Sequence, residues 1–213
     1  MVKWYHTSFP SSWRGFDSRY PLQSRSVFSP ITRAGLSVLQ CRILLRVSGA
    51  RPRSKDMDTR FLTPLNPDEQ LAHGLPKPVP MAMADRVRFS EIDILQHVNN
   101  KAYLDWFEAL RVHYYNTHFR QHFGDLQPRH VVRNANIHYV KEMVLGETYV
   151  TTARVLSFRR TSYTMEQQIW CGDLRATMEG VMVFRTPDGK SGYPIPDSLR
   201  RQFAELDGAI AAE

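Results

Sequence analysis

Cysteine is scarce in this 213-residue chain, which holds only Cys41 and Cys171, far apart in the sequence. Two cysteines without a CxxC pair support neither a disulfide framework nor a zinc knuckle, and a reducing compartment is favoured. The 11 glycines and 13 prolines are too few for a fibrous or generally disordered chain. With 42% hydrophobic residues, the composition is that of a globular protein of about one domain.

A long hydrophobic run is also missing. The longest apolar stretch, around residues 36–47, is interrupted by Gln40, Arg42 and Arg46. It is shorter than a bilayer requires, so we expect no membrane span. The chain contains no Walker loop, Rossmann fingerprint, HExxH or GxSxG motif. Nucleotide hydrolysis, hydride transfer, zinc proteolysis and serine hydrolysis therefore have no support from motifs.

Acidic residues are nearly absent from the first quarter of the chain. Residues 1–55 hold ten Lys or Arg and one acid, Asp17, whereas the remainder holds 18 basic and 20 acidic residues. The net charge of +7 therefore belongs to the beginning of the chain. Because the rest is slightly acidic and lacks the basic surface that nucleic acids require, we expect no nucleic-acid partner.

Residues 1–56 are interpreted as a basic extension outside the folded domain, because they show no sustained helical or strand period. A disordered tail, or sequence ahead of a misassigned start at Met57 or Met81, is favoured over a mitochondrial transit peptide, which shares this Arg-rich and Ser-rich composition. The expected location is cytoplasmic, with a mitochondrial one as the alternative. Proline-rich residues 57–82 predict an irregular lead-in to a folded domain at 83–207.

The regular part of the chain predicts one long helix. Apolar residues recur at Tyr103, Phe107, Leu110 and Tyr114, at intervals of three and four. This period places them on one face of a helix that spans residues 100–119. Such a face must be buried against another layer of structure.

Strand character precedes and follows this helix. One strand is predicted from Met83 to Phe89, and a short helix at residues 197–206 closes the chain. Four stretches rich in Val, Ile, Thr, Tyr and Phe lie between the two helices, at residues 131–140, 147–158, 162–171 and 174–185. The order of one strand, a long helix and an antiparallel meander predicts an α+β fold in which the sheet wraps the helix.

The segment that carries chemistry runs from Val87 to Arg111. Asp93 lies in a loop just ahead of the predicted helix start at Asn99 or Asn100, with His97 between them. A helix start presents unpaired backbone N–H groups and a partial positive charge, which together polarise a carbonyl oxygen. A carboxylate beside it can attack the carbonyl carbon or activate a water molecule. Together they suit acyl transfer without a serine or a metal.

These residues also resemble a known family. The run DILQHVNN at residues 93–100, followed by Tyr103-Leu104 and by FEALR at 107–111, is similar to the D-x-x-x-H-V-N-N-x-x-Y-L…F-E-x-x-R signature of the 4-hydroxybenzoyl-CoA thioesterase-like branch of hotdog-fold acyl-CoA thioesterases. The similarity extends more weakly over residues 83–206. It implies a hotdog fold, with a long central helix wrapped by a curved antiparallel sheet, and an active site between subunits of a homodimer or homotetramer.

The resemblance assigns roles to the loop and the helix start. Asp93 is expected to be the nucleophile or general base, and the backbone amide of Asn100 or of a neighbouring residue is expected to hold the thioester carbonyl. His97 either orients water or substrate or satisfies backbone groups. Many members have Gly at the position of Gln96, whereas members similar to long-chain acyl-CoA thioesterases share the QHVNN run seen here. This favours a fatty-acyl substrate and a role in lipid metabolism.

Four further residues are candidates for substrate binding. Asn99 is expected to act as a helix cap whose backbone contributes to the site. Tyr103 belongs to the core or to the wall of an acyl pocket. Arg159 and Arg160, at a predicted hairpin turn, are candidates for the phosphates of coenzyme A, because guanidinium groups bind phosphate well. Solubility alone explains two arginines at an exposed turn equally well.

The expected function is hydrolysis of an acyl-CoA thioester to free acid and coenzyme A, with no metal or other cofactor. The carrier is coenzyme A or acyl carrier protein. A non-catalytic sensor dimer that binds acyl-CoA or acyl carrier protein stays open as an alternative. A hotdog hydratase or dehydratase is disfavoured, because its usual motif places Asp and His around an Asn-Pro that this loop lacks.

Overall fold

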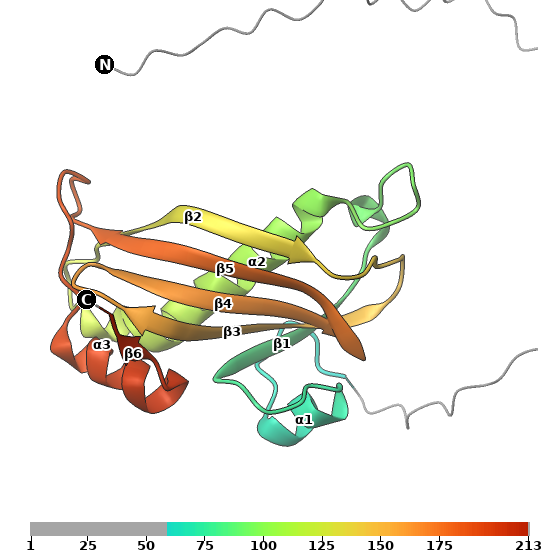
Figure 1. The fold of residues 1–213 in the computed structure, drawn as a ribbon, viewed down its shortest axis with the longest axis horizontal. Coiled ribbons are helices and arrows are strands. Elements are labelled where there is room, and N and C mark those ends of the chain that lie inside the picture. Colours follow the sequence, from blue (N-terminus) through green and yellow to red (C-terminus); the bar gives the residue numbers. More distant parts are fainter. Residues whose placement is uncertain (1–58, 213) are drawn as a thin grey trace, which may run out of the picture. The chain divides into compact units, whose positions relative to one another are not determined.

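The structure is a computed structural model that describes residues 59–212, so the interpretation of residues 1–56 lies outside the described residues. In the described part, a six-stranded sheet lies against one long helix (Figure 1). The strands are β1 (Met81–Arg86), β2 (Arg129–Tyr139), β3 (Thr148–Phe158), β4 (Ser162–Cys171), β5 (Asp173–Arg185) and β6 (Ile210–Ala211). The helices are α1 (Pro67–Ala72), α2 (Asn100–Tyr114) and α3 (Asp197–Gln202). Short 3-10 helices lie at Phe89–Glu91 and Arg120–His122, and short π-helical segments follow α2 at Tyr115–Phe119 and α3 at Phe203–Asp207.

The sheet has the strand order β1-β3-β4-β5-β2, with antiparallel neighbours along this path. β1 pairs with β3 from Thr148 to Ala153, and the short β6 pairs in parallel with Ser157 and Phe158 further along the same edge. The opposite edge is β2, which pairs only with β5 in the described part of the chain. One edge of the sheet is thus shared by the two short strands β1 and β6. The other edge is the long strand β2, whose outer side has no partner strand in the described chain.

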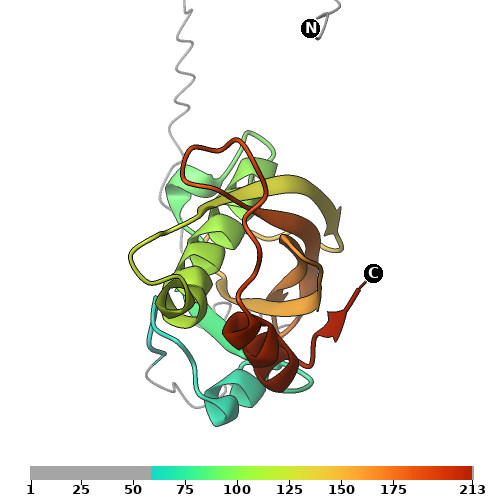
Figure 2. The ribbon, with the colours of Figure 1, turned by 90° about the vertical axis from the view of Figure 1, so that its left-hand side faces the viewer.

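α2 packs its apolar face against the sheet, which curves around it (Figure 2). Its buried residues recur at the predicted intervals and are Ala102, Tyr103, Trp106, Phe107, Leu110 and Tyr114. On the sheet, the fully buried Gln167 donates its Nε2–H to the carbonyl of Phe107 at 2.7 Å, so this polar side chain is satisfied by the helix backbone. The α+β prediction, with a sheet wrapped around a long helix, is confirmed.

The lead-in is more ordered than the sequence predicts. α1 begins with a capping box, in which Asn66 and Glu69 satisfy each other's backbone N–H groups. Pro67, which suggested irregular chain, occupies the first helical turn, where proline is well tolerated. A second apolar cluster joins this segment to β1 and β3, and consists of Leu65, Leu75, Ala82, Ala84 and Val150. Residues from 59 onward therefore pack as part of the domain.

β2 is exposed along most of its length. The alternation of Ala135, Ile137 and Tyr139 predicts a buried face, yet only Ile137 is half-buried and the other two are exposed. The reason is that β2 is an edge strand, and the rest of the described chain covers it only in part. A strand with buried-type alternation and a free edge is suited to pairing with another chain.

Asp207, after α3, connects three elements near the end of the domain. Its carboxylate accepts a hydrogen bond from the Tyr114 hydroxyl at 2.7 Å and from the Val155 N–H at 2.9 Å. The group is largely buried, and burial raises the pKa of Asp207 to about 6. The folded state therefore binds a proton at this carboxyl more tightly than the unfolded state does.

We predict that Asp207→Asn changes how stability depends on pH. Because the folded pKa is raised, the contribution of Asp207 to stability is present below about pH 4 and is lost as the pH rises through 6. The free energy of unfolding of the wild type, relative to Asp207→Asn, should fall by roughly 2–3 kcal/mol between pH 4 and pH 7. Urea denaturation at several pH values measures this difference. A difference that stays constant or grows with pH would contradict the prediction.

Candidate functional site

The loop between β1 and α2 is closed by backbone hydrogen bonds. Asp93 donates its N–H to the carbonyl of His97 at 2.9 Å, and Gln96 donates to the carbonyl of Asp93 at 3.1 Å. The loop is attached to the rest of the domain by Val98, which donates to the carbonyl of Met143 at 2.8 Å. At its base, Glu91 accepts a hydrogen bond from the indole N–H of Trp106 at 2.8 Å. The loop is therefore fixed both to itself and to the core.

Gln96 adopts a left-handed backbone conformation, with φ of 65°. This conformation costs a residue with a Cβ roughly 1–2 kcal/mol, whereas glycine adopts it freely. The turn before His97 thus has a conformation suited to glycine although a glutamine occupies it, and backbone strain of this kind is often found at functional sites.

Asp93 is half-buried and uses only one carboxylate oxygen within the loop. Its Oδ1 accepts a hydrogen bond from the N–H of Leu95 at 2.8 Å, which holds the side chain in one orientation. Its Oδ2 has no hydrogen-bond partner among residues 59–212. The residue therefore stabilises its own turn and still presents a free oxygen.

The start of α2 leaves one backbone donor open. Asn99 is the N-cap, as expected, and its side chain accepts the N–H of Lys101 at 3.1 Å. Its carbonyl accepts the N–H of Ala102 at 2.9 Å, and its own N–H donates to Glu91. The N–H of Asn100, the first helical residue, has no partner in the described chain. This free donor lies where the helix dipole is most positive.

These groups line an open cleft of about 380 Å³. The loop and α2 contribute Asp93, His97, Val98, Asn100 and Tyr103, and the segment after β2 contributes Tyr139, Val140, Lys141 and Glu142. The cleft brings together every predicted catalytic residue, and one predicted binding residue, Tyr103. Across the cleft, the imidazole Nε2 of His97 lies 3.4 Å from a carboxylate oxygen of Glu142. A carboxylate, an imidazole and an open backbone donor thus face the same space.

Tyr103 forms the aromatic floor of the cleft. The residue is 3% exposed, and its ring centroid lies 5.2 Å from that of Trp106 and 5.1 Å, edge to face, from that of Tyr139. Burial raises the pKa of Tyr103 to about 12, so the phenol stays protonated. The residue belongs to the core and to the cleft wall at once, which were the two possibilities left open by the sequence.

The wall formed by Tyr139–Glu142 is missed by the sequence analysis. No motif marks these residues, and they reach the cleft only through the register of β2 on β5, which pairs Tyr139 with Ala176. Turn-forming residues after the strand could have shown where β2 ends, but not that the segment after β2 faces the Asp93 loop. Within residues 59–212, no group of three or more His, Cys, Asp or Glu side chains is arranged to hold a metal ion.

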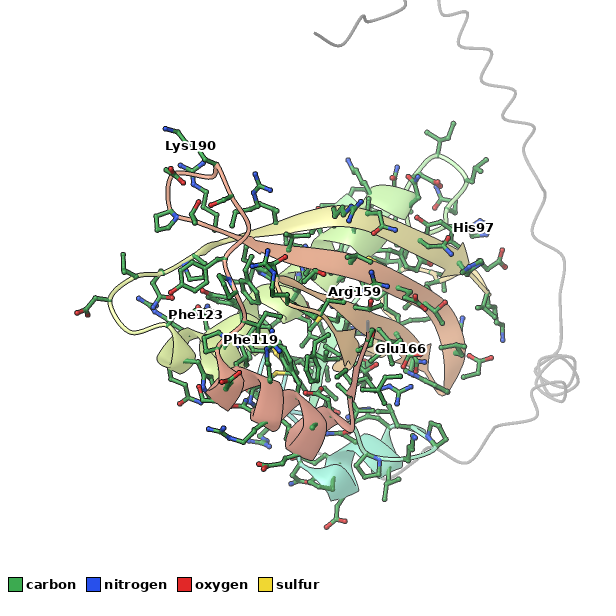
Figure 3. All side chains as sticks on the ribbon, turned by 60° about the vertical axis from the view of Figure 1, so that its left-hand side comes forward. His97, Phe119, Phe123, Arg159, Glu166 and Lys190 are labelled. Carbon is green, nitrogen blue, oxygen red and sulfur yellow. The ribbon has the colours of Figure 1, made fainter. Side chains whose placement is uncertain are left out.

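Arg159 and Arg160 do not lie at this cleft within one subunit. They follow β3, whose first residue is next to the segment that holds the Asp93 loop. A strand of this length spans roughly 30 Å, so the two arginines lie at the far end of β3 from the segment that leads into the Asp93 loop. Figure 3 shows His97 and Arg159 in separate parts of the molecule. Their assignment to coenzyme A phosphates stays a prediction.

Arg175, at the start of β5, holds the cleft wall of residues Tyr139–Glu142 in place. Its guanidinium is 9% exposed and donates to the carbonyl of Glu142 at 2.7 Å and to the carboxylate of Asp173 at 2.6 Å. Its backbone carbonyl accepts the N–H groups of Val140 and Lys141 at 2.8 and 3.1 Å. Side chain and backbone of one residue therefore fix the wall that faces Asp93.

A curved antiparallel sheet around one helix, with a carboxylate loop at the helix start, defines a hotdog fold with a surface cleft. A profile of the Thioesterase-like superfamily matches residues 87–203. A thioesterase-superfamily structure from Jannaschia sp. CCS1 is 39% identical, covers 72% of this chain and 99% of its own, and has a TM-score of 0.66. The chain belongs to the thioesterase-like superfamily.

More distant structures share the fold. A thioesterase from Thermus thermophilus, solved as a complex with coenzyme A and Zn, is 27% identical over 61% of this chain and 96% of its own, with a TM-score of 0.53. SAV2348 from Staphylococcus aureus, solved in complex with CoA, is 16% identical over 62% of this chain and 86% of its own, with a TM-score of 0.55. No curated protein matches the chain. No helix within residues 59–212 is long and apolar enough to cross a membrane.

We predict that Arg175→Met loosens the cleft wall. The substitution leaves the carbonyl of Glu142 without this donor, whereas the exposed carboxylate of Asp173 keeps its ion pair with Lys141. It should therefore lower the free energy of unfolding by about 2 kcal/mol. Hydrogen exchange of the amides in residues 140–143 should become faster. The control is Arg154→Met, which removes a half-buried ion pair with Glu166 on the same sheet and should cost about 1 kcal/mol or less. Unchanged exchange in residues 140–143 would contradict this role for Arg175.

Proposed function

We propose that this protein is an acyl-CoA thioesterase that hydrolyses an acyl-CoA, with a fatty acyl group as the favoured substrate, to free acid and coenzyme A. The observation that carries the proposal is the free Oδ2 of Asp93 at a cleft that also contains the open N–H of Asn100. Membership in the thioesterase-like superfamily supports it. So does the Thermus relative described as a complex with coenzyme A.

The proposed chemistry uses Asp93 in one of two ways. As a nucleophile, its carboxylate attacks the thioester carbonyl carbon, the C–S bond breaks, and water then hydrolyses the acyl anhydride. As a general base, it takes a proton from a water molecule that attacks the same carbon. In both routes negative charge develops on the carbonyl oxygen, and the N–H of Asn100 would stabilise it. His97, whose imidazole faces Glu142, is proposed to orient the water or the substrate.

The proposed assembly is a homodimer or a homotetramer. The exposed edge of β2 supports this, because a second copy could add its strand there. Ile94, at the tip of the Asp93 loop, is 94% exposed, and Phe89 and Leu95 on the same segment are also exposed. An apolar acyl chain or a partner subunit would cover such side chains favourably. The 4-hydroxybenzoyl-CoA thioesterase-like branch, a role in lipid metabolism and a cytoplasmic location remain part of the proposal, with a mitochondrial location as the alternative.

Two alternatives make different predictions for the same cleft. A sensor of acyl-CoA or acyl carrier protein would bind its ligand at the cleft without releasing thiol. A hydratase or dehydratase would change the acyl chain and leave the thioester intact. The free carboxylate oxygen of Asp93 favours the thioesterase over the sensor, because a binding protein needs no attacking group there.

We predict that Asp93→Asn lowers thiol release from acyl-CoA by about 100-fold or more, because the amide can neither attack nor accept a proton. Asparagine keeps an oxygen for the N–H of Leu95, so the loop should stay closed. The matched control is Asp105→Asn, an exposed aspartate on α2 outside the cleft, which should keep the wild-type rate. Thiol release from a panel of acyl-CoA chain lengths measures the rates.

The possible outcomes separate the alternatives. An unchanged rate in Asp93→Asn would remove Asp93 from the mechanism. Binding of acyl-CoA by the wild type without thiol release would favour the sensor. Hydration of a 2-enoyl-CoA without thiol release would favour the hydratase.

We also predict that Asn100→Pro lowers the rate by about 100-fold, the loss expected for one oxyanion donor. Proline is tolerated at the first helical position, and Asn99 already has the extended conformation, with φ of −62° and ψ of 138°, that a residue before proline prefers. The substitution thus removes the N–H and should preserve the helix. Comparison with Asn100→Ala, which keeps the N–H, isolates the donor. Equal rates for the two variants would exclude the Asn100 amide as the oxyanion donor.

A further inference from the structure

Tyr103 carries a hydroxyl group that the rest of the described chain does not use. The residue is 3% exposed, yet its hydroxyl has no hydrogen-bond partner within residues 59–212. Polar groups on buried side chains are normally hydrogen-bonded, because burial without a partner forfeits the hydrogen bonds that water supplies. A tyrosine whose ring is packed and whose hydroxyl is unpaired therefore requires an explanation.

The hydroxyl of Tyr103 opens into the Asp93 cleft. In the described part of the chain, the Nε2 atom of His118 is the only side-chain nitrogen or oxygen that is both fully buried and unpaired. The Tyr103 hydroxyl is unpaired and is therefore accessible, and Tyr103 lines the cleft. Burial raises the pKa of Tyr103 to about 12, and the charges of Arg175 and Glu142 also act on this pKa. These two residues belong to the cleft wall and its support, so the hydroxyl end of the ring faces the wall.

Tyr103 lies one helical turn beyond the proposed carbonyl-binding position. It follows Asn100 by three residues on α2, which places it on the same side of the helix and about 4.5 Å further along the axis. A thioester whose carbonyl oxygen is held by the N–H of Asn100 has two arms. The large, polar coenzyme A arm must lead out to solvent, so the arm that reaches the floor at Tyr103 is the acyl group.

The surroundings of this hydroxyl are mostly aromatic and aliphatic. The ring of Tyr103 contacts those of Trp106 and Tyr139, and the cleft is also lined by Val98 and Val140. A saturated acyl chain would pack on these groups, but it would remove water from the hydroxyl without replacing the lost hydrogen bond. An acyl group with an oxygen near the thioester would keep the apolar contacts and also pair the hydroxyl.

We propose that the hydroxyl of Tyr103 forms a hydrogen bond with the acyl group of the substrate, and that the preferred acyl group carries a hydroxyl or keto oxygen close to the thioester, as in a β-hydroxyacyl-CoA. A phenol donates to either oxygen and also accepts from a hydroxyl. Tyr103 is then a specificity-determining residue that contacts the substrate, whereas the attack belongs to Asp93. The proposal rests on the proposed function and narrows the fatty acyl group named there.

The test compares thiol release from a β-hydroxyacyl-CoA and from the saturated acyl-CoA of the same chain length. The wild type should have the higher kcat/KM for the β-hydroxyacyl-CoA. Tyr103→Phe should lower this value about tenfold, the loss expected for one neutral hydrogen bond, and should keep or raise the value for the saturated substrate. Equal losses for both substrates, or no loss for either, would overturn the proposal.

The matched control is Tyr193→Phe, which removes the hydroxyl of a half-buried tyrosine outside the cleft and should keep both values of kcat/KM. Thermal melting checks the fold. Phenylalanine keeps the ring contacts with Trp106 and Tyr139, so Tyr103→Phe should melt at or above the wild-type temperature. A lower melting temperature would show that the hydroxyl has a structural partner, which would also overturn the proposal.

Binding of substrate analogues separates this proposal from the proposed function. The probes are ketone analogues of the two acyl-CoAs, in which a methylene group between carbonyl and sulfur prevents hydrolysis. In isothermal titration the wild type should bind the β-hydroxy analogue about tenfold more tightly than the saturated one, and Tyr103→Phe should bind both equally. If the wild type releases thiol from no acyl-CoA, the proposed function fails. The titration still decides the role of Tyr103, because equal wild-type affinity for both analogues would overturn it.

Discussion

The cleft depends on backbone hydrogen bonds that join the start of α2 to two other segments. Val98 donates to the carbonyl of Met143, and Asn99 donates to the carbonyl of Glu91 at 2.7 Å. Because helix ends fray unless they are held, these two bonds fix the direction in which the open N–H of Asn100 points. The frame of the cleft is therefore made of main chain. Neither of these two backbone bonds involves the side chain of Asp93 or of His97.

One local cost lies at this frame. Gln96 occupies a left-handed conformation, which lowers the stability of the fold. This cost is offset nearby by the N-cap hydrogen bond of Asn99 and by the bond from Trp106 to Glu91. Strain that is tolerated at a site and compensated beside it indicates that the geometry is maintained for binding or chemistry.

The sequence predicts local features well and long-range ones poorly. The intervals from Tyr103 to Tyr114 correctly predict which face of α2 is buried, because helical periodicity is a local property. The Asp93–Asn100 run likewise predicts a loop and a helix cap. The wall at Tyr139–Glu142 depends on strand register, which no local pattern encodes.

Two other differences between the sequence-based predictions and the structure also arise from contacts between residues that are distant in the chain. The proline-rich segment before β1 indicates irregular chain by composition, yet its Leu65 and Leu75 find a surface on β1 and β3 that only the folded sheet provides. Arg159 and Arg160 are equivalent in the sequence, and a bulge in β2 at Arg133 distinguishes them, because Arg133 lines one hollow with Arg159 and not with Arg160. In each case the deciding contact joins residues that are distant in the chain.

The position of β2 connects the proposed assembly to the cleft. Its last residue, Tyr139, is 49% exposed and lies in the cleft wall, and its bulged residue is Arg133. A strand added to the free edge of β2 would form backbone hydrogen bonds next to both positions, and a bulge would restrict the registers in which it could pair. Tyr139 packs edge to face on Tyr103. A partner strand that held β2 in place would therefore also hold Tyr103, at the floor of the cleft, through this direct contact. Association of two copies and organisation of the site would then be one process, because the same strand carries the exposed edge and the residues that line the cleft.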